Sequence, residues 1–121
     1  MARLPTAALA AFLQDLPQPA SAHWPEGVPF VEVMRHGTMS LEIFAPSGAD
    51  HQTPHEQDEL YVVVGGSAQF DHEGAVTPVV SGDAIFVPAG DAHHFRDMSE
   101  DFVTWVIFWG PKGGEPDNGG R

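Results

Sequence analysis

The stretch HQTPHEQDELYVVVGG, residues 51–66, decides the fold, because it carries polar side chains directly into a β-strand. It begins with two histidines and several carboxylates and continues as the apolar run at residues 60–64. Side chains alternate between the two faces of a strand, so His55, Glu59 and Tyr61 are expected on one face. A carboxylate that points into an apolar interior costs several kcal/mol unless it is paired or bound to a metal. The pattern therefore predicts a cation shared by His55 and Glu59.

A second stretch, GDAIFVPAGDAHHF at residues 82–95, has the same character. Its beginning reads as a tight turn, residues 84–87 as a strand, and residues 88–92 as a second turn that delivers His93. Gly82 and Gly90 give the backbone the freedom that such turns need. His93 is therefore a second imidazole that could reach the same interior.

Together the two stretches resemble the two sequence motifs of the cupin superfamily. The first family motif ends in a histidine, three or four residues, a glutamate, six residues and a glycine. The second runs from a glycine through Pro-x-Gly to a histidine and an asparagine. The matching positions in this chain are His55, Glu59 and Gly66, then Gly82, Pro88, Gly90, His93 and Asp97.

The resemblance implies an all-β fold, the double-stranded β-helix or jelly-roll barrel, with a divalent metal near its centre. It implies His55, Glu59 and His93 as metal ligands. The remaining family ligand would stand at Thr53, which is a poor donor, so a neighbouring residue is expected to replace it. Gln52 is favoured, because a subset of small cupins has the same Gln-Thr-Pro-His order. His51 is the alternative, although it lies about 13 Å from His55 along an extended strand.

This ligand set does not select one metal. Two histidines and one carboxylate suit non-haem Fe(II), and they would also hold Zn, Mn or Ni, because availability and geometry decide among such ions. A hydrogen-bonded polar cluster without metal is the alternative interpretation of the same three residues.

The chain divides into three parts by pattern. Residues 1–27 are expected to form a short helix, capped by Thr6 and carrying apolar residues on one face from Leu9 to Leu16, followed by an extended proline-rich arm. Residues 28–110 hold eight or nine short strand patterns and are expected to form the cupin barrel. Residues 111–121 are rich in Gly and Pro and are expected to be a flexible tail.

Composition narrows the classes of function. The 121 residues fit one domain, and the net charge of −12, with only five Lys and Arg, disfavours nucleic acids and anionic membranes as partners. The sequence has no cysteine, and its N-terminal apolar run is too short and interrupted for a signal peptide or a membrane span. A cytoplasmic protein is expected.

These features favour a metal-dependent enzyme that acts on a small organic molecule, either a dioxygenase or an isomerase, lyase or cyclase. A non-catalytic binder of a metal or small molecule is the alternative. Tyr61, Phe95 and Trp105 are the aromatic candidates for contact with a ligand. Side chains on the early strands could also reach the mouth of the barrel, namely Glu32, Arg35, His36 and Glu42. A homodimer is expected, formed through the sheet edge at residues 28–45.

Overall fold

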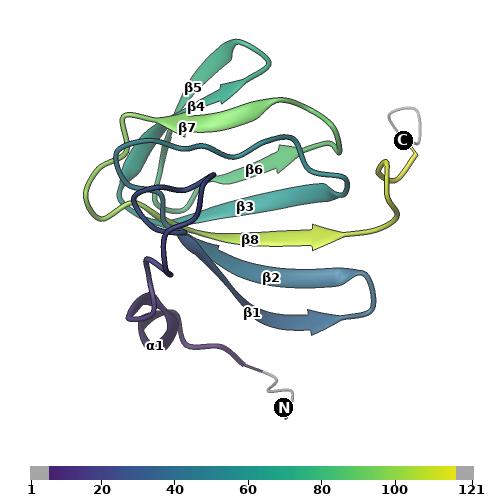
Figure 1. Ribbon diagram of the computed structural model, residues 1–121. Coiled ribbons are helices and arrows are strands. Elements are labelled where there is room, and N and C mark those ends of the chain that lie inside the picture. Colours follow the sequence, from purple (N-terminus) through teal and green to yellow (C-terminus); the bar gives the residue numbers. More distant parts are fainter. Residues whose placement is uncertain (1–5, 117–121) are drawn as a thin grey trace.

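The structure is a computed structural model that describes residues 6–116, and it consists mainly of antiparallel strands (Figure 1). The elements in chain order are α1 (Leu9–Leu13), β1 (Phe30–His36), β2 (Met39–Phe44), β3 (Asp58–Gly65), β4 (Ser67–His72), β5 (Ala75–Val80), β6 (Ala84–Val87), β7 (His93–Arg96) and β8 (Val103–Trp109). Each strand falls within a segment that the sequence pattern predicts. The predicted all-β class is confirmed in its coarse form, a mostly β architecture with one short helix.

One sheet has five strands in the order β1-β2-β8-β3-β6, and the other has three in the order β5-β4-β7. All of the pairings are antiparallel. Tight turns join β1 to β2, β3 to β4 and β4 to β5, and Gly66, between β3 and β4, has a φ of +72°. A Cβ atom at Gly66 would lie 2.7 Å from the Cα atom of Phe102, so both the conformation and the space require glycine there.

The hydrophobic core lies between the inner faces of the two sheets. Burial alternates along the strands, as it does for Tyr61 and Val63 on β3, which are at most 1% exposed, while their neighbours on the other face are only half-buried. The core consists of Trp24, Phe44, Tyr61, Val63, Ala68, Phe70, Val79, Val87, Phe95, Phe102, Val106 and Phe108.

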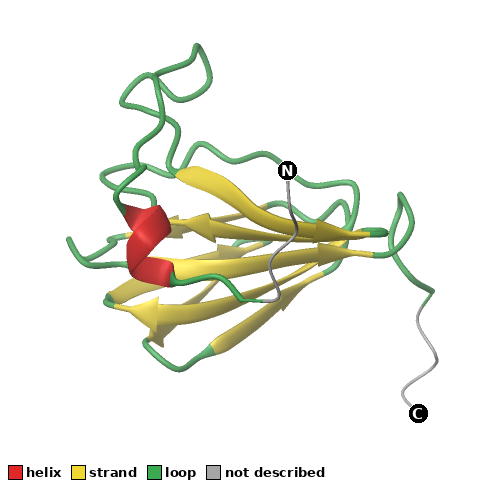
Figure 2. Ribbon diagram, turned by 90° about the horizontal axis from the view of Figure 1, so that it is seen from below, coloured by secondary structure: helices red, strands yellow, loops and turns green. Residues whose placement is uncertain are grey.

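The N-terminal segment differs from the prediction in two ways. The helix begins after Ala8 and spans five residues, and no side chain caps it, so the predicted cap by Thr6 is wrong. The proline-rich arm is not a free linker, because Gln18 and Val28 form an isolated β-bridge and Trp24 is buried in the core. Helix α1 lies at the β1–β2 end of the molecule, away from the three-stranded sheet (Figures 1 and 2).

Residues 111–116 fold back on the body, so this part of the predicted flexible tail is ordered. The N–H of Gly113 donates to the carbonyl of Glu56, and the N–H of Glu115 donates to the buried carboxylate of Asp58. The rest of the predicted tail lies outside the described residues. Within residues 6–116, no helix has the length and hydropathy to cross a membrane.

Candidate metal centre

Three side chains that are far apart in the sequence meet in the interior: His55, Glu59 and His93. Each offers one ligand atom, and these atoms all lie within 4.8 Å of one another. The centroids of the two imidazole rings are 5.6 Å apart. The side chain of Glu59 is 1% exposed, whereas that of His55 is 34% exposed. The cluster is therefore deep on the glutamate side and open to the cavity on the His55 side.

The three residues come from different parts of the fold. Glu59 lies on β3, paired with Val87 on β6 and with Phe108 on β8, and its side chain points into the core. His93 is the first residue of β7 in the other sheet. His55 precedes β3 by three residues, so its predicted place on the same regular strand is wrong, and the loop rather than strand alternation brings it to Glu59.

Hydrogen bonding fixes the orientation of His93. Its Nδ1 is 2.8 Å from the carbonyl oxygen of Asp91, so Nδ1 carries the proton that this bond needs. In a neutral ring, Nε2 is then a lone-pair acceptor, yet it faces Glu59 Oε1 at 2.7 Å. Both oxygens of Glu59 also lack a hydrogen-bond donor among the described residues. Two acceptors this close need a cation between them, which can be a proton on Nε2 or a metal ion.

The surroundings shift the pKa values of His55 and His93 in opposite directions. Burial lowers the pKa of His55, and the charge of Glu59 opposes this only in part. Burial also acts to lower the pKa of His93, but the carboxylate of Glu59, 2.7 Å away, outweighs it, so the pKa of His93 is raised. His55 is thus favoured in its neutral form, which is the form that binds metal.

Gln52 joins the cluster, and the half-buried Asp50 determines which way its amide points. Gln52 Nε2 donates to Asp50 Oδ2 at 2.6 Å, so Oε1 is turned the other way. Gln52 Oε1 accepts a hydrogen bond from the Tyr61 hydroxyl at 2.8 Å and lies 3.2 Å from His55 Nε2. Asp50 itself is held by the N–H of Phe95 at 2.8 Å. The result is an amide oxygen that faces His55 Nε2, one of the three ligand atoms.

His51, the alternative to Gln52, lies elsewhere. Its Nε2 is 2.8 Å from Glu26 Oε1, and its ring meets the edge of Trp24 at a centroid distance of 5.4 Å. The structure therefore brings Gln52, and not His51, to the cluster. Thr53 is exposed on the same loop. Asp50 is not among the residues expected from the sequence. The residues around it do not reveal its role, because its partner Phe95 is remote in sequence.

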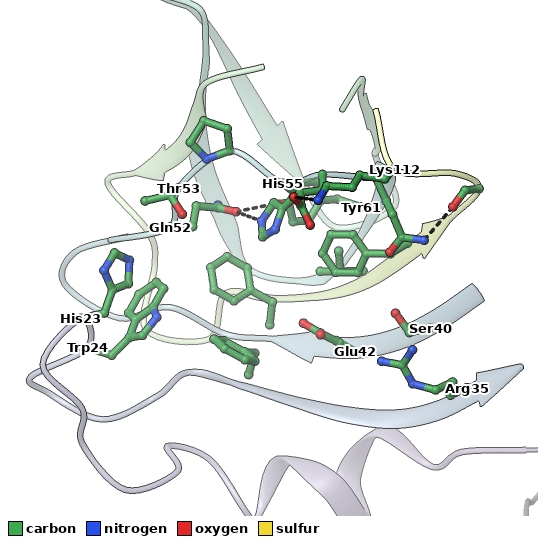
Figure 3. Close-up of a pocket in the computed structure, with 18 residues that line it drawn as sticks. His23, Trp24, Arg35, Ser40, Glu42, Gln52, Thr53, His55, Tyr61 and Lys112 are labelled. Atoms are coloured by element: carbon green, nitrogen blue, oxygen red, sulfur yellow. Dashed lines mark hydrogen bonds and ion pairs between the residues drawn. The ribbon is translucent and has the colours of Figure 1, made fainter. Parts of the chain in front are cut away.

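A cavity of about 690 Å³ adjoins the cluster (Figure 3). His55, Gln52 and Tyr61 line it at the cluster end, and Trp24, Phe30, Phe44 and Phe108 give it apolar walls. Of the aromatic candidates from the sequence, Tyr61 lines the cavity. Phe95 is buried in the core behind Tyr61, at a ring-centroid distance of 5.0 Å. Trp105 is wrong as a candidate, because it is half-buried on the outer face of β8 and does not line the cavity.

The early strands bring Arg35 and Glu42 to this cavity, as the sequence left open. Glu42 pairs with Glu32 of β1 on one side and with Val106 of β8 on the other. Burial, followed by the charges of Glu32 and Glu59, raises the pKa of Glu42 to about 7, and the charge of Arg35 opposes the shift. Figure 3 shows Glu42 beside Ser40 and Arg35, on the side of the cavity away from Gln52.

The Glu42→Gln variant of the metal-free protein is expected to be more stable than the wild type at pH 8 by about 1–2 kcal/mol, after allowing for solvent screening. The pKa of Glu42 rises from an ordinary 4.5 to about 7 on folding, so the folded wild type holds the proton more tightly. Its stability relative to the variant therefore falls from pH 4.5 to pH 7 and is constant above that. Urea unfolding at pH 4.5 and pH 8 measures this. Glu100→Gln, at an exposed turn, is the control, and an equal effect of Glu42→Gln at both pH values would contradict the prediction.

The comparisons with known proteins place this geometry in a family. The sequence matches the Cupin domain family over residues 40–109, a range that contains both predicted motifs. An uncharacterized protein of Streptomyces coelicolor is 38% identical over 85 residues, which are 69% of this chain and 81% of that protein.

Solved structures show the same fold. A Cupin 2 conserved barrel domain protein from Salinispora arenicola is similar with a TM-score of 0.58 and 18% identity, over 67% of this chain and 74% of that one. The DMSP lyase DddQ from Ruegeria pomeroyi is similar with a TM-score of 0.57 and 24% identity, over 67% of this chain and 46% of that one. At such identities the likeness shows the fold alone.

Proposed function

Because this chain belongs to the cupin family, we propose that it is a metal-dependent enzyme that acts on a small organic molecule in the cavity beside His55, Glu59 and His93. Those three side chains would hold a divalent ion, and Gln52 Oε1 would be its fourth protein ligand. The observation that carries the proposal is the unsatisfied Glu59 carboxylate, which faces the acceptor nitrogen of a buried histidine. We also propose that residues 28–110 form a complete double-stranded β-helix, the jelly-roll barrel.

The donor set fits a catalytic ion better than a structural one. Structural sites are closed by protein ligands, whereas catalytic sites keep positions open. Here two of the four candidate ligands, Gln52 and His55, line a cavity of about 690 Å³, into which the exposed part of His55 opens. A bound Fe(II), Zn, Mn or Ni ion would polarise an oxygen atom of the substrate or, as Fe(II), activate O₂.

The residues around the cluster have defined tasks in this proposal. Burial raises the pKa of the Tyr61 phenol well above its usual range, so Tyr61 stays protonated and holds Gln52 Oε1 by donation. The aromatic walls exclude water from one side of the cavity. At the level of the fold, one structural neighbour is a lyase by name, so the architecture is compatible with catalysis.

The proposal is tested by metal loading followed by a search for turnover. Chelator-treated protein is incubated with Fe(II), Zn, Mn or Ni, desalted, and analysed for bound metal, for which we expect one ion per chain. Oxygen uptake with the Fe(II) form then separates a dioxygenase from an isomerase, lyase or cyclase. Failure to retain any of the four metals would exclude the proposal, and ligand binding without turnover would favour the non-catalytic binder.

Asp50→Ala is expected to weaken metal binding by about 10-fold, in the range that loss of a residue supporting a metal ligand produces. Without Asp50, the Gln52 amide loses the acceptor of its Nε2, and only the Tyr61 hydroxyl still holds Oε1, so Oε1 is held less firmly toward His55. The measurement is a competition titration of Zn with a chromophoric chelator. Gln52→Glu in the Asp50→Ala background tests the cause, because either carboxylate oxygen can then serve as the ligand and affinity should recover. An unchanged affinity for Asp50→Ala would contradict the assignment of Gln52.

We further propose a homodimer through the edge of the five-stranded sheet. Strand β1 is an edge of that sheet, and its outward face carries the half-buried Val31 and Met34. An edge strand with apolar side chains can pair with a second copy. Light scattering at micromolar concentration should give 26 kDa, twice the chain mass of 13.0 kDa, and Val31→Lys should give the single mass. A wild-type mass of one chain would contradict the dimer.

A further inference from the structure

The cavity contains one acidic side chain that has no ion-pair partner. Two of the side chains that line it are Arg or Lys, and each already has an acidic partner. Arg35 contacts Glu32 through two nitrogens, and Lys112 Nζ lies 3.0 Å from Glu56 Oε1. Among the described residues, no ion pair or hydrogen bond is formed by the side chain of Glu42. The unbalanced charge in the cavity is therefore that of Glu42.

The field at Glu42 favours positive charge. Its pKa is raised by burial and then by the carboxylates of Glu32 and Glu59, and the opposing effect of Arg35 is the weakest of these. Two negative neighbours thus outweigh one positive neighbour that is already engaged with Glu32. A cationic group placed beside Glu42 would relieve this repulsion and stabilise the ionised carboxylate.

Aromatic rings line the same cavity as this carboxylate. Trp24 meets Phe30 and Phe44 at ring-centroid distances of 6.2 Å, so the three rings are contiguous. All three line the cavity with Glu42, and Phe44 lies two residues from it, on the same face of β2. Ammonium groups are attracted to the faces of aromatic rings, most strongly to Trp. A carboxylate beside such a wall is a typical setting for an organic cation.

The position of Glu42 relative to the cluster limits the size of the ligand. Glu42 lies on β2 and Glu59 on β3, with β8 between them. Adjacent strands are about 4.8 Å apart, so the two acidic residues lie on strands separated by about 10 Å. A small molecule with a cationic end at Glu42 and an oxygen atom at the other end could reach both.

We propose that the cavity binds a small organic cation, a primary amine or a quaternary ammonium compound, with Glu42 as its counter-charge and Trp24, Phe30 and Phe44 as the wall against its cationic group. The inference rests on the proposed function in one respect: an oxygen atom at the other end of the ligand would contact the metal held by His55, Glu59 and His93. The inference thus gives the substrate of that site as a cation and excludes an anionic substrate.

Three probes of nearly the same shape and different charge test the inference by calorimetric titration. They are choline, its uncharged carbon isostere dimethylbutanol, and the corresponding anion dimethylbutanoate. Each is titrated into the metal-free and the Zn-loaded protein. We expect choline to bind at least about 10-fold more tightly than dimethylbutanol in both forms. Dimethylbutanoate carries its charge at the oxygen end, so we expect it to bind most weakly in the metal-free protein, where no ion can take up its carboxylate. Equal binding of choline and dimethylbutanol, or tighter binding of the anion than of choline to the metal-free protein, would overturn the inference.

Glu42→Gln identifies the residue responsible. This variant should lose the preference for choline, about 10-fold in affinity, while its affinity for dimethylbutanol and its Zn content stay unchanged. The exposed Glu100→Gln should bind all three probes as the wild type does. A preference for choline that survives Glu42→Gln would overturn the assignment. If the protein binds choline but no metal, the proposed function fails and this inference stands. If the protein retains metal but shows no preference for choline, this inference fails and the proposed function stands.

Discussion

The Glu59→Gln variant is expected to lose tight metal binding, with affinity for Zn or Fe(II) at least about 100-fold below that of the wild type. Gln keeps the shape of the side chain but removes the anionic ligand, which is 1% exposed and faces His93 Nε2 at 2.7 Å. Metal-free Glu59→Gln should be as stable as metal-free wild type within about 1 kcal/mol, or more stable, because a buried charge without hydrogen bonds is removed. Metal titration and urea unfolding of the same samples give both quantities.

The combination distinguishes a metal ligand from a purely structural carboxylate. A structural role predicts that the metal-free variant is strongly destabilised, whereas a ligand role predicts lost affinity with little change in metal-free stability. Glu56→Gln is the matched control, since Glu56 lies three positions earlier with a side chain that is 71% exposed. Wild-type affinity in Glu59→Gln would contradict the metal centre.

The Trp24→Ala variant is expected to be less stable by about 3–4 kcal/mol, the usual cost of removing a large aromatic side chain from a core. Trp24 is 6% exposed and contacts Phe30, Phe44 and His51, although it lies in a segment whose composition predicts a free arm. Urea unfolding of the metal-free protein gives the free energy directly. The neighbouring, exposed His23→Ala is the control and should change stability by less than about 0.5 kcal/mol.

A midpoint for Trp24→Ala that equals that of the wild type would show that the arm is not part of the cooperative core. A smaller dependence of the unfolding free energy on urea would indicate that the arm detaches before the rest unfolds. Either outcome would contradict the assignment of Trp24 to the main core.

The strands were predictable because their signals are local. Alternating burial and tight turns specify each strand within about ten residues, and all eight strands lie where the pattern expects them. The convergence of Glu59 and His93 was predictable only through the motif spacing, since the two residues lie in different sheets. The spacing of the two motifs predicts how the two sheets face each other, which the pattern of a single strand does not.

The parts that sequence reasoning missed depend on contacts between distant segments. The loop that carries Gln52 and His55 is shaped by Asp50, whose carboxylate is held by the N–H of Phe95, 45 positions later. The arm is held by the Gln18–Val28 bridge and by the packing of Trp24. Composition predicts the conformation of such a segment in isolation. In the folded protein, packing against distant segments determines its conformation instead.

The wall that Trp24 and Phe30 contribute has a practical consequence for anyone who trims the gene for expression. The family match begins at residue 40, after the arm and β1, although both supply side chains to the cavity. A fragment cut to residues 40–109 would retain His55, Glu59 and His93. It would leave Phe44 without the rings of Trp24 and Phe30, and Glu42 without strand β1. Such a fragment would be a poor reagent for ligand screening, even where its metal chemistry survived the truncation.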